Sequence, residues 1–269
     1  MNSKIFYDQQ KKSLVYLAQS ATPEFWDKHW EAEDFVRSIM QYNRFLSKIT
    51  NKFLQIGSTV LEGGCGTGKN LYTLQQSGYE ALGIDYAPQT VALINKYCPE
   101  LAVVVGDVRV LPFNDDSFDG YWSLGVIEHF YVGYHDIVRE MARVIRPGGY
   151  LFLTFPHMNP LRKLKARFGF YPMLLDEFQT GYDDFYQFAL DVESTKKQFN
   201  LYGFTLVHSE KFDGVKGLKD ELSYLKPILQ RIYDSRLFLL RGCKKVMDIM
   251  LKKWCGHSVL LVLKLEGKS

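Results

Sequence analysis

Short apolar runs alternate with helical spacings between residues 58 and 156 of the chain. The apolar runs, each bounded by polar or glycine residues, predict strands at 59–61, 81–85, 102–107, 118–123 and 150–155. Apolar residues three or four positions apart predict the intervening helices at 69–77, 88–97 and 135–145. Strands that alternate with helices form βαβ units, so this pattern predicts a parallel sheet with helices on both faces.

The remainder of the chain divides into three parts around this core, residues 56–156. Residues 1–55 carry large apolar residues at spacings of three to five from Phe25 onward, which predicts a helical segment, and its aromatic run at 25–30 could cover a ligand. Residues 157–202 are aromatic and mixed in charge, and we interpret them as an inserted, substrate-side segment. Residues 203–269 complete the same domain, with strands at 204–207 and 258–265 and basic helices between them, which makes seven strands in total.

A glycine-rich loop follows the first predicted strand, with the sequence E-G-G-C-G-T-G-K-N from Glu62 to Asn70. Glycine allows positive φ and lets a ligand approach the bare backbone. The G-x-x-x-x-G-K spacing of a phosphate-binding P-loop is present, but Asn70 stands where that motif needs Ser or Thr for magnesium. The G-x-G-x-x-G dinucleotide fingerprint is not matched, because the spacing here is G-x-G-x-G. The third interpretation joins Glu62 to the glycines as E-x-G-x-G-x-G.

Carboxylates end the next two predicted strands at near-equal steps. Asp85 lies 23 residues after Glu62, and Asp107 lies 22 residues after Asp85. In parallel sheets, ligands bind at the carboxyl ends of the strands, near the switch in strand order. A carboxylate at Asp85 can accept hydrogen bonds from both hydroxyls of a ribose. The loop and the two acids together therefore predict a nucleoside site.

Three further segments extend this pattern: residues 111–119 (L-P-F-N-D-D-S-F-D), 123–130 (S-L-G-V-I-E-H-F) and 146–151 (R-P-G-G-Y-L). With the glycine loop, they resemble class I S-adenosylmethionine-dependent methyltransferases, specifically the small-molecule group that includes the ubiquinone and menaquinone enzymes. The resemblance covers residues 58–156 and implies a Rossmann-like fold, S-adenosylmethionine as cofactor and S-adenosylhomocysteine as product. The cofactor-binding residues that it implies are Glu62, Gly63, Gly64, Gly66, Gly68, Asp85, Tyr86, Asp107, Val108 and Ser123.

Glu128 and His129 follow the fourth predicted strand and are the candidate catalytic residues. Histidine titrates near neutral pH and can deprotonate an acceptor hydroxyl as a general base. Two alternatives stay open: a divalent metal site, weakened because Gly125 replaces the first Glu of the E-x-x-E-H element in similar enzymes, and a purely structural role. We predict no metal and favour O-methylation of a small molecule such as a sugar, a quinone or a lipid-linked metabolite.

Composition places few further limits on function. The chain has 269 residues, 46% of them hydrophobic, four cysteines without C-x-x-C spacing, and no signal-peptide pattern at its start, so we expect a cytoplasmic protein. Its net charge of +3 is uneven, because residues 196–269 hold 15 Lys+Arg against 7 Asp+Glu. This basic region leaves a nucleic-acid or protein methyltransferase open as an alternative, although we do not expect nucleic acid as a partner. A catalytically silent nucleotide-binding protein is the other alternative.

Within the basic region, residues 237–254 combine apolar residues with clustered lysines. A basic amphipathic helix of this kind can lie on a membrane surface, which would make the protein peripheral to that membrane. The alternative is a helix packed on the sheet with its lysines in water, favoured by Gly242 and Asp248, which interrupt the apolar pattern. The sequence does not define an oligomeric state.

Overall fold

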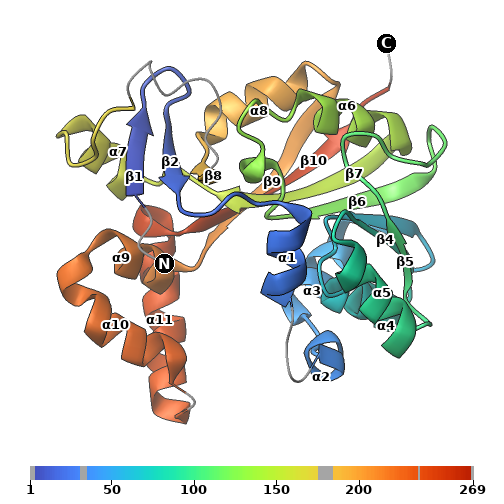
Figure 1. The fold of residues 1–269 in the computed structure, drawn as a ribbon, viewed down its shortest axis with the longest axis horizontal. Helices are drawn as coiled ribbons and strands as arrows, with labels where there is room; N and C mark the ends of the chain where they lie inside the picture. Colours follow the sequence, from blue (N-terminus) through green and yellow to red (C-terminus); the bar gives the residue numbers. More distant parts are fainter. Residues whose placement is uncertain (1–3, 31–34, 175–183, 236, 268–269) are drawn as a thin grey trace.

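Seven strands form the central sheet of the computed structural model, which describes residues 4–30, 35–174, 184–235 and 237–267 (Figure 1). Their order is β5-β4-β3-β6-β7-β10-β9. β10 is antiparallel to both neighbours, and the pairs from β5 to β7 are parallel. The predicted seven-stranded, mostly parallel α/β fold is confirmed. The strands are β3 (Thr59–Gly63), β4 (Glu80–Asp85), β5 (Ala102–Val105), β6 (Phe118–Leu124), β7 (Ile145–Pro156), β9 (Phe204–Phe212) and β10 (Ser258–Leu265).

Helices cover both faces of this sheet, and strand residues alternate between them. In β10, Val259, Leu261 and Leu263 join the core cluster beneath α6 and α8. Leu260 and Val262 join the cluster on the opposite face, beneath α3, α4 and α5. The covering helices are α3 (Arg44–Phe53), α4 (Lys69–Gln76), α5 (Pro88–Tyr97), α6 (His135–Val144) and α8 (Val192–Asn200).

The N-terminal segment begins with strands, which corrects the prediction of helix throughout residues 1–55. β1 (Lys4–Asp8) and β2 (Ser13–Leu17) form a hairpin, and β8 (Phe185–Ala189) from the predicted insertion pairs with β2. Helices occupy the rest: α1 (Pro23–Trp30), α2 (Phe35–Ile39) and α3. The apolar spacing behind the helix prediction starts at Phe25, whereas the apolar residues before it form two short runs, I-F-Y at 5–7 and L-V-Y-L at 14–17, as strands do.

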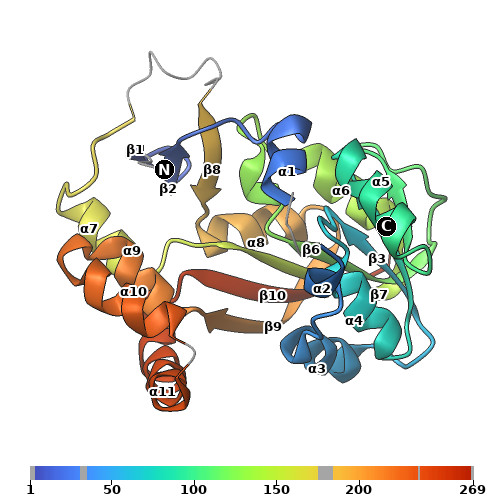
Figure 2. The ribbon, with the colours of Figure 1, turned by 60° about the horizontal axis from the view of Figure 1, so that its bottom comes forward.

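Helices dominate the part between β9 and β10, as predicted. They are α9 (Gly214–Glu221), the short η3 (Ser223–Leu225), α10 (Lys226–Asp234) and α11 (Phe238–Cys255), and α11 continues through Gly242. The insertion adds α7 (Pro160–Arg167), while its residues 175–183 lie outside the described residues. In Figures 1 and 2, α9, α10 and α11 stand together beside α7, on the side of the molecule away from α4 and α5.

The strand order reverses between β3 and β6. From β3 the chain builds outward through β4 to β5, and it then returns to place β6 on the other side of β3. The loops after β3 and β6 therefore meet at the carboxyl edge of the sheet, where doubly wound folds bind ligands. The loop after β6 contains the short helix η1 (Ile127–His129).

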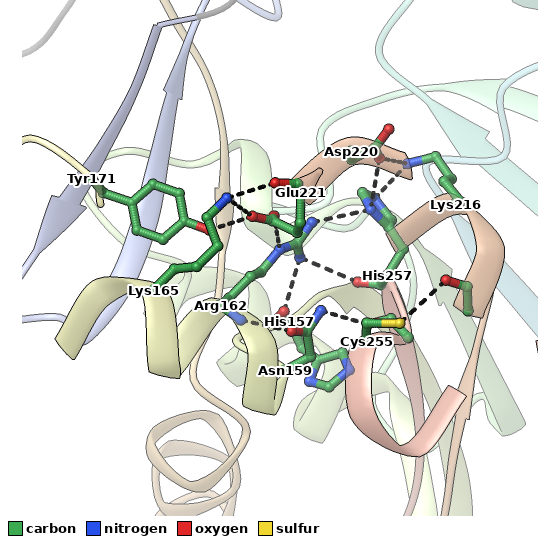
Figure 3. A network of polar contacts seen from close by, with 12 residues as sticks. His157, Asn159, Arg162, Lys165, Tyr171, Lys216, Asp220, Glu221, Cys255 and His257 are labelled. Atoms are coloured by element: carbon green, nitrogen blue, oxygen red, sulfur yellow. Dashed lines mark hydrogen bonds and ion pairs between the residues drawn. The ribbon is translucent and has the colours of Figure 1, made fainter. Parts of the chain in front are cut away.

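A buried polar network joins α7, α9 and the start of β10 (Figure 3). At its centre lies Arg162, whose side chain is fully buried and donates from Nε to Glu221 Oε1 at 2.8 Å. Glu221 also accepts from Lys165 Nζ at 2.7 Å and from the Tyr171 hydroxyl. On the other side of Arg162, its Nη2 lies 3.1 Å from His257 Nδ1. The inserted segment and the helices that follow β9 are thus held together by charge as well as by apolar packing.

Candidate functional site

The glycine loop after β3 has the backbone geometry expected of a ligand cradle. Gly64, Gly66 and Gly68 have φ values of 71°, 51° and 78°, in the left-handed region that glycine adopts without strain. A Cβ atom on Gly64 would lie 2.6 Å from Val126 Cγ2, and one on Gly66 would lie 3.1 Å from the Trp30 ring. The backbone therefore favours glycine at all three positions, and Val126 also leaves little room for a side chain at Gly64.

A cavity of about 530 Å³ opens above this loop, at the switch in strand order. Six of the ten predicted cofactor residues line it: Gly64, Gly66, Asp85, Tyr86, Asp107 and Val108. The other four, Glu62, Gly63, Gly68 and Ser123, do not line the cavity: Glu62 and Gly63 end β3, Ser123 lies in β6 and Gly68 caps α4. Trp26 and Trp30, from the aromatic run that the sequence offered as a cover, also line the cavity. Several other lining residues were not predicted, and they come from the N-terminal segment, the stretch after β5 and the region after β6: Ala21, Thr22, Pro23, Arg109, Leu124, Val126, Phe130, Tyr131, Val132, Gly133 and Asp136.

Glu62 lies behind the loop, where it stabilises the loop's connection to α4. Its Oε1 accepts from Asn70 Nδ2 at 2.9 Å, and its Oε2 is buried without a hydrogen-bond partner. Burial raises the pKa of Glu62 to about 8. Asn70, the residue that argued against a P-loop, thus has a defined role in this loop.

Asp85 faces the cavity from the end of β4. Its Oδ2 accepts from the Gly66 amide at 2.8 Å and its Oδ1 from the Ala87 amide at 3.0 Å. Burial raises the pKa of Asp85, and these amides oppose that rise. Each carboxylate oxygen keeps a further lone pair, so the side chain can still accept from a ligand hydroxyl.

Asp107 lies at the other end of the cavity and is paired within its own loop. Arg109 donates from Nε to both Asp107 oxygens at 3.0 Å and from Nη2 to Oδ2 at 2.6 Å. Burial alone would raise the pKa of Asp107, but the hydrogen bonds and charge of Arg109 hold it below its usual value. A ligand amino group would share this carboxylate with Arg109, a competitor two residues away that the sequence analysis missed.

His129 lines the cavity, whereas Glu128 does not. His129 Nδ1 lies 2.6 Å from the Tyr186 backbone oxygen, and burial lowers the pKa of this histidine to about 4. Because a carbonyl can only accept, Nδ1 carries the proton and Nε2 keeps its lone pair. Glu128 is buried beside it, with Oε2 unpartnered and its pKa raised to about 8 by burial. Among the described residues, no three His, Cys, Asp or Glu side chains come together as a metal ion would need.

Helix α1 contributes aromatic rings to the wall of the cavity. Trp26 meets the His129 ring edge to face at 5.1 Å between centroids and stacks on Trp30 at 5.8 Å. The helix is fixed by Asp27 Oδ1, which accepts from the Thr90 amide at 2.8 Å and from its hydroxyl at 2.9 Å. The aromatic run of residues 25–30 was the signal in the sequence for this covering role.

The comparisons with known proteins agree with this geometry. Residues 61–153 match the model of the methyltransferase domain family. The chain is 35% identical over 147 residues to the probable tRNA methyltransferase 9B of Mus musculus, a match that covers 54% of this chain and 29% of that protein. It is 34% identical over 118 residues to the demethylmenaquinone methyltransferase of Beutenbergia cavernae, over 43% of this chain and 48% of that protein. The chain thus spans less than half the length of these two relatives.

Solved structures show the same fold over most of the chain. An S-adenosylmethionine-dependent methyltransferase from Methanosarcina mazei superposes with a TM-score of 0.56 at 18% identity, covering 82% of this chain and 98% of that one. The glycine cradle, the acid at the cavity wall and the sheet order all suit the same cofactor. Residues 61–153 therefore resemble a methyltransferase domain, and the chain has the class I, Rossmann-like fold of these solved structures.

Proposed function

We propose that this chain transfers a methyl group from S-adenosylmethionine to a small apolar acceptor that binds between α1 and η1. The observation that carries the proposal is the aromatic wall of the cavity, formed by Trp26, His129, Phe130 and Tyr131. Flat, apolar acceptors pack well against such rings. Trp26 and Trp30 of α1 and Phe130 and Tyr131 after η1 would contact such an acceptor from two sides.

The chain's own residues would position the two reactants. Bound S-adenosylmethionine supplies a methyl group already activated on a sulfonium. Gly64 and Gly66 would bring bare backbone close to the cofactor, Asp85 would accept the ribose hydroxyls, and Val108 would contact the nucleobase. Holding an acceptor oxygen in line with the methyl group supplies much of the rate, so no elaborate catalytic machinery is required.

His129 is the candidate general base for O-methylation. Its free Nε2 would take the proton of the acceptor hydroxyl as the new O–C bond forms and the S–C bond breaks. With a pKa of about 4, His129 is a weak base, so an acidic hydroxyl such as a phenol suits it better than an aliphatic alcohol. The name of the Beutenbergia relative, demethylmenaquinone methyltransferase, supports an acceptor of this aromatic kind. We assign Glu128 no direct contact with the acceptor.

An RNA acceptor is the second candidate. It is favoured by the name of the Mus musculus relative, probable tRNA methyltransferase 9B, and by the basic charge of residues 196–269. The aromatic lining of the cavity, which suits a small apolar acceptor, is the observation against it.

Calorimetry tests the cofactor site first. The wild-type chain should bind both S-adenosylmethionine and S-adenosylhomocysteine, and Asp85→Ala should weaken both by about tenfold to a hundredfold because it removes hydrogen bonds to a charged acceptor. Asp85→Asn, which keeps one acceptor oxygen, should weaken them less. Circular dichroism checks that both variants fold. Failure of the wild type to bind either compound would sink the enzyme proposal, and unchanged affinity in Asp85→Ala would remove the ribose assignment.

The acceptor is tested with methyl-labelled S-adenosylmethionine, offered with a hydroquinone in one reaction and total tRNA in another. Label in the hydroquinone supports the small-molecule proposal. Label in tRNA alone would overturn it in favour of the second candidate.

A further inference from the structure

The outward face of α11 is unusually apolar for a surface helix. Val246, Ile249, Met250 and Trp254 are 57%, 59%, 75% and 51% exposed. Their spacing of three to four residues places them in one stripe along the helix. Single exposed apolar residues are ordinary, but a contiguous stripe of four indicates an interaction surface.

The opposite face of α11 fixes the helix in place. It packs against α9, α10, α7 and β9. Asp248, the one acid within α11, is half-buried, and its Oδ1 accepts from the Val215 amide at the start of α9 at 2.8 Å. Cys255, the last residue of the helix, is fully buried. The inner face of α11 is therefore already packed and hydrogen-bonded, and the apolar stripe on its outer face is exposed to solvent.

Cations flank the stripe. Lys245 and Lys253 are exposed, and in the described parts of the chain no acidic side chain pairs with either. Beside the helix lies a hollow of about 490 Å³ whose lining includes Arg241, Lys244 and Lys245. Two of the three acids in that hollow are already engaged: Glu210 with Lys252 at 2.9 Å, and Asp248 with the α9 amide. The stripe thus borders a surface with an excess of positive charge.

We propose that α11 docks on the surface of a bilayer that contains anionic lipid. Val246, Ile249, Met250 and Trp254 enter the boundary between headgroups and acyl chains, and the lysines contact lipid phosphates. Nucleic acid would satisfy the lysines but would give the aliphatic side chains no apolar environment, so a bilayer fits the whole face better. The contact is peripheral, because no described helix is long and apolar enough to cross a membrane. The stripe lies outside the methyl-transfer cavity, so this inference does not depend on the proposed function.

Vesicle flotation tests the proposal with the full chain. The probes are phosphatidylcholine vesicles with and without about one third phosphatidylglycerol. The wild-type chain should float with the anionic vesicles and bind the neutral ones at least about tenfold more weakly. Ile249→Glu/Met250→Glu should reduce binding by about a hundredfold, because each buried aliphatic side chain contributes about tenfold. Lys245→Glu/Lys253→Glu should also lose binding, and added salt should weaken the binding of the wild type because it screens the attraction between lysines and phosphates.

Leu201→Glu is the matched control, since Leu201 is 81% exposed but lies before the start of β9, whereas α11 lies beyond the other end of that strand. It should float like wild type, and circular dichroism should show all variants folded. Absence of flotation, or flotation that Ile249→Glu/Met250→Glu does not change, overturns the proposal. The proposal is also overturned if the wild type binds tRNA but not vesicles and only the lysine variant loses that tRNA binding. It is likewise overturned if sedimentation shows that the wild type is a dimer and that Ile249→Glu/Met250→Glu is a monomer.

Discussion

At the scale of single residues, the site depends on side chains that meet across long stretches of sequence. His129 is oriented by the backbone of Tyr186, and Glu62 is held by Asn70, whose Oδ1 accepts from Asn43 Nδ2 at 3.2 Å. Such partners fix tautomers and rotamers that the reactive groups would not keep by themselves. The chemistry of the cavity is therefore sensitive to substitutions outside its lining.

His129→Ala should reduce turnover by about a hundredfold or more, since general-base catalysis contributes at least that much. Cofactor affinity measured by calorimetry should stay unchanged, because His129 lies on the acceptor side of the cavity. His135→Ala, which alters an exposed histidine outside the cavity lining, is the control and should retain turnover. Equal turnover in the two variants would assign His129 a structural role.

Glu128→Gln should make stability less dependent on pH. A carboxyl whose folded pKa is raised to about 8 favours folding while protonated; this contribution is complete below its unfolded value near 4.5 and is lost as pH rises through about 8. The amide of Gln cannot ionise. The Tm of the wild type should therefore decrease between pH 6 and pH 9 by more than the Tm of Glu128→Gln. Glu193→Gln, at an exposed position, should behave as wild type, and identical pH profiles for all three proteins would contradict the burial effect.

The sequence could place the strand-end acids but not their partners. Asp85 and Asp107 are located by apolar runs that end sharply in polar residues, a local pattern. The burial of Glu128 and the contact between His129 and Tyr186 depend on how β8 packs, which involves residues far along the chain. The environment of a side chain depends on tertiary packing, so the local sequence pattern could not predict it.

At the scale of elements, α1 and α5 complete one another. α5 begins after Ala87, whose side chain cannot cap a helix, and Asp27 of α1 supplies the missing acceptor to Thr90 in the first turn. Helix α1 is thus held against α5 by a side chain that replaces the missing N-cap of α5. Pro88 at the first helical position made the start of α5 predictable, whereas the cap provided by another segment was not.

Asp27→Ala should loosen α1 without unfolding the domain. Loss of a cap costs about 1 kcal/mol, so Tm should fall only slightly. The cofactor should dissociate about fivefold faster, as measured by stopped-flow fluorescence of the tryptophans in α1, because the helix that covers it is less firmly held. Asp27→Asn keeps an acceptor oxygen and should lie close to wild type. Dissociation at the wild-type rate in Asp27→Ala would show that α1 does not retain the cofactor.

At the scale of the whole molecule, the network around Arg162 joins regions that the sequence divides. It connects α7 of the insertion, α9 and the start of β10, and Tyr171 beyond α7 contacts Glu221 (Figure 3). Arg162, Lys163, Lys165 and Arg167 stand close together in the mixed-charge segment of the sequence, yet Arg162 is fully buried. Charge spacing alone does not reveal which member of such a cluster faces inward.

Arg162→Met should destabilise the protein by about 3 kcal/mol, because it leaves the buried Glu221 carboxylate without its main partner. Urea unfolding measures the loss. Arg162→Met/Glu221→Gln should recover most of it, since the uncompensated charge is removed. Lys163→Met, at an exposed neighbour, should change stability little. If the single and double variants unfold at the same urea concentration, the uncompensated charge on Glu221 is not the cause of the lost stability.

The register of β9 and β10 has a consequence for how this chain could change over evolutionary time. Phe212 and Ser258 face each other across the two strands, so α9, α10 and α11 leave the sheet and return to it at adjacent points. A tight turn could close that gap and keep every strand in place. Deletion would nonetheless remove Glu221 and His257, the ion-pair and hydrogen-bond partners of the Arg162 guanidinium, and would uncover the face of α7 that they pack against. The sheet topology does not require α9, α10 and α11, but the polar contacts of Arg162 do. A lineage could therefore lose these helices only after Arg162 had been replaced.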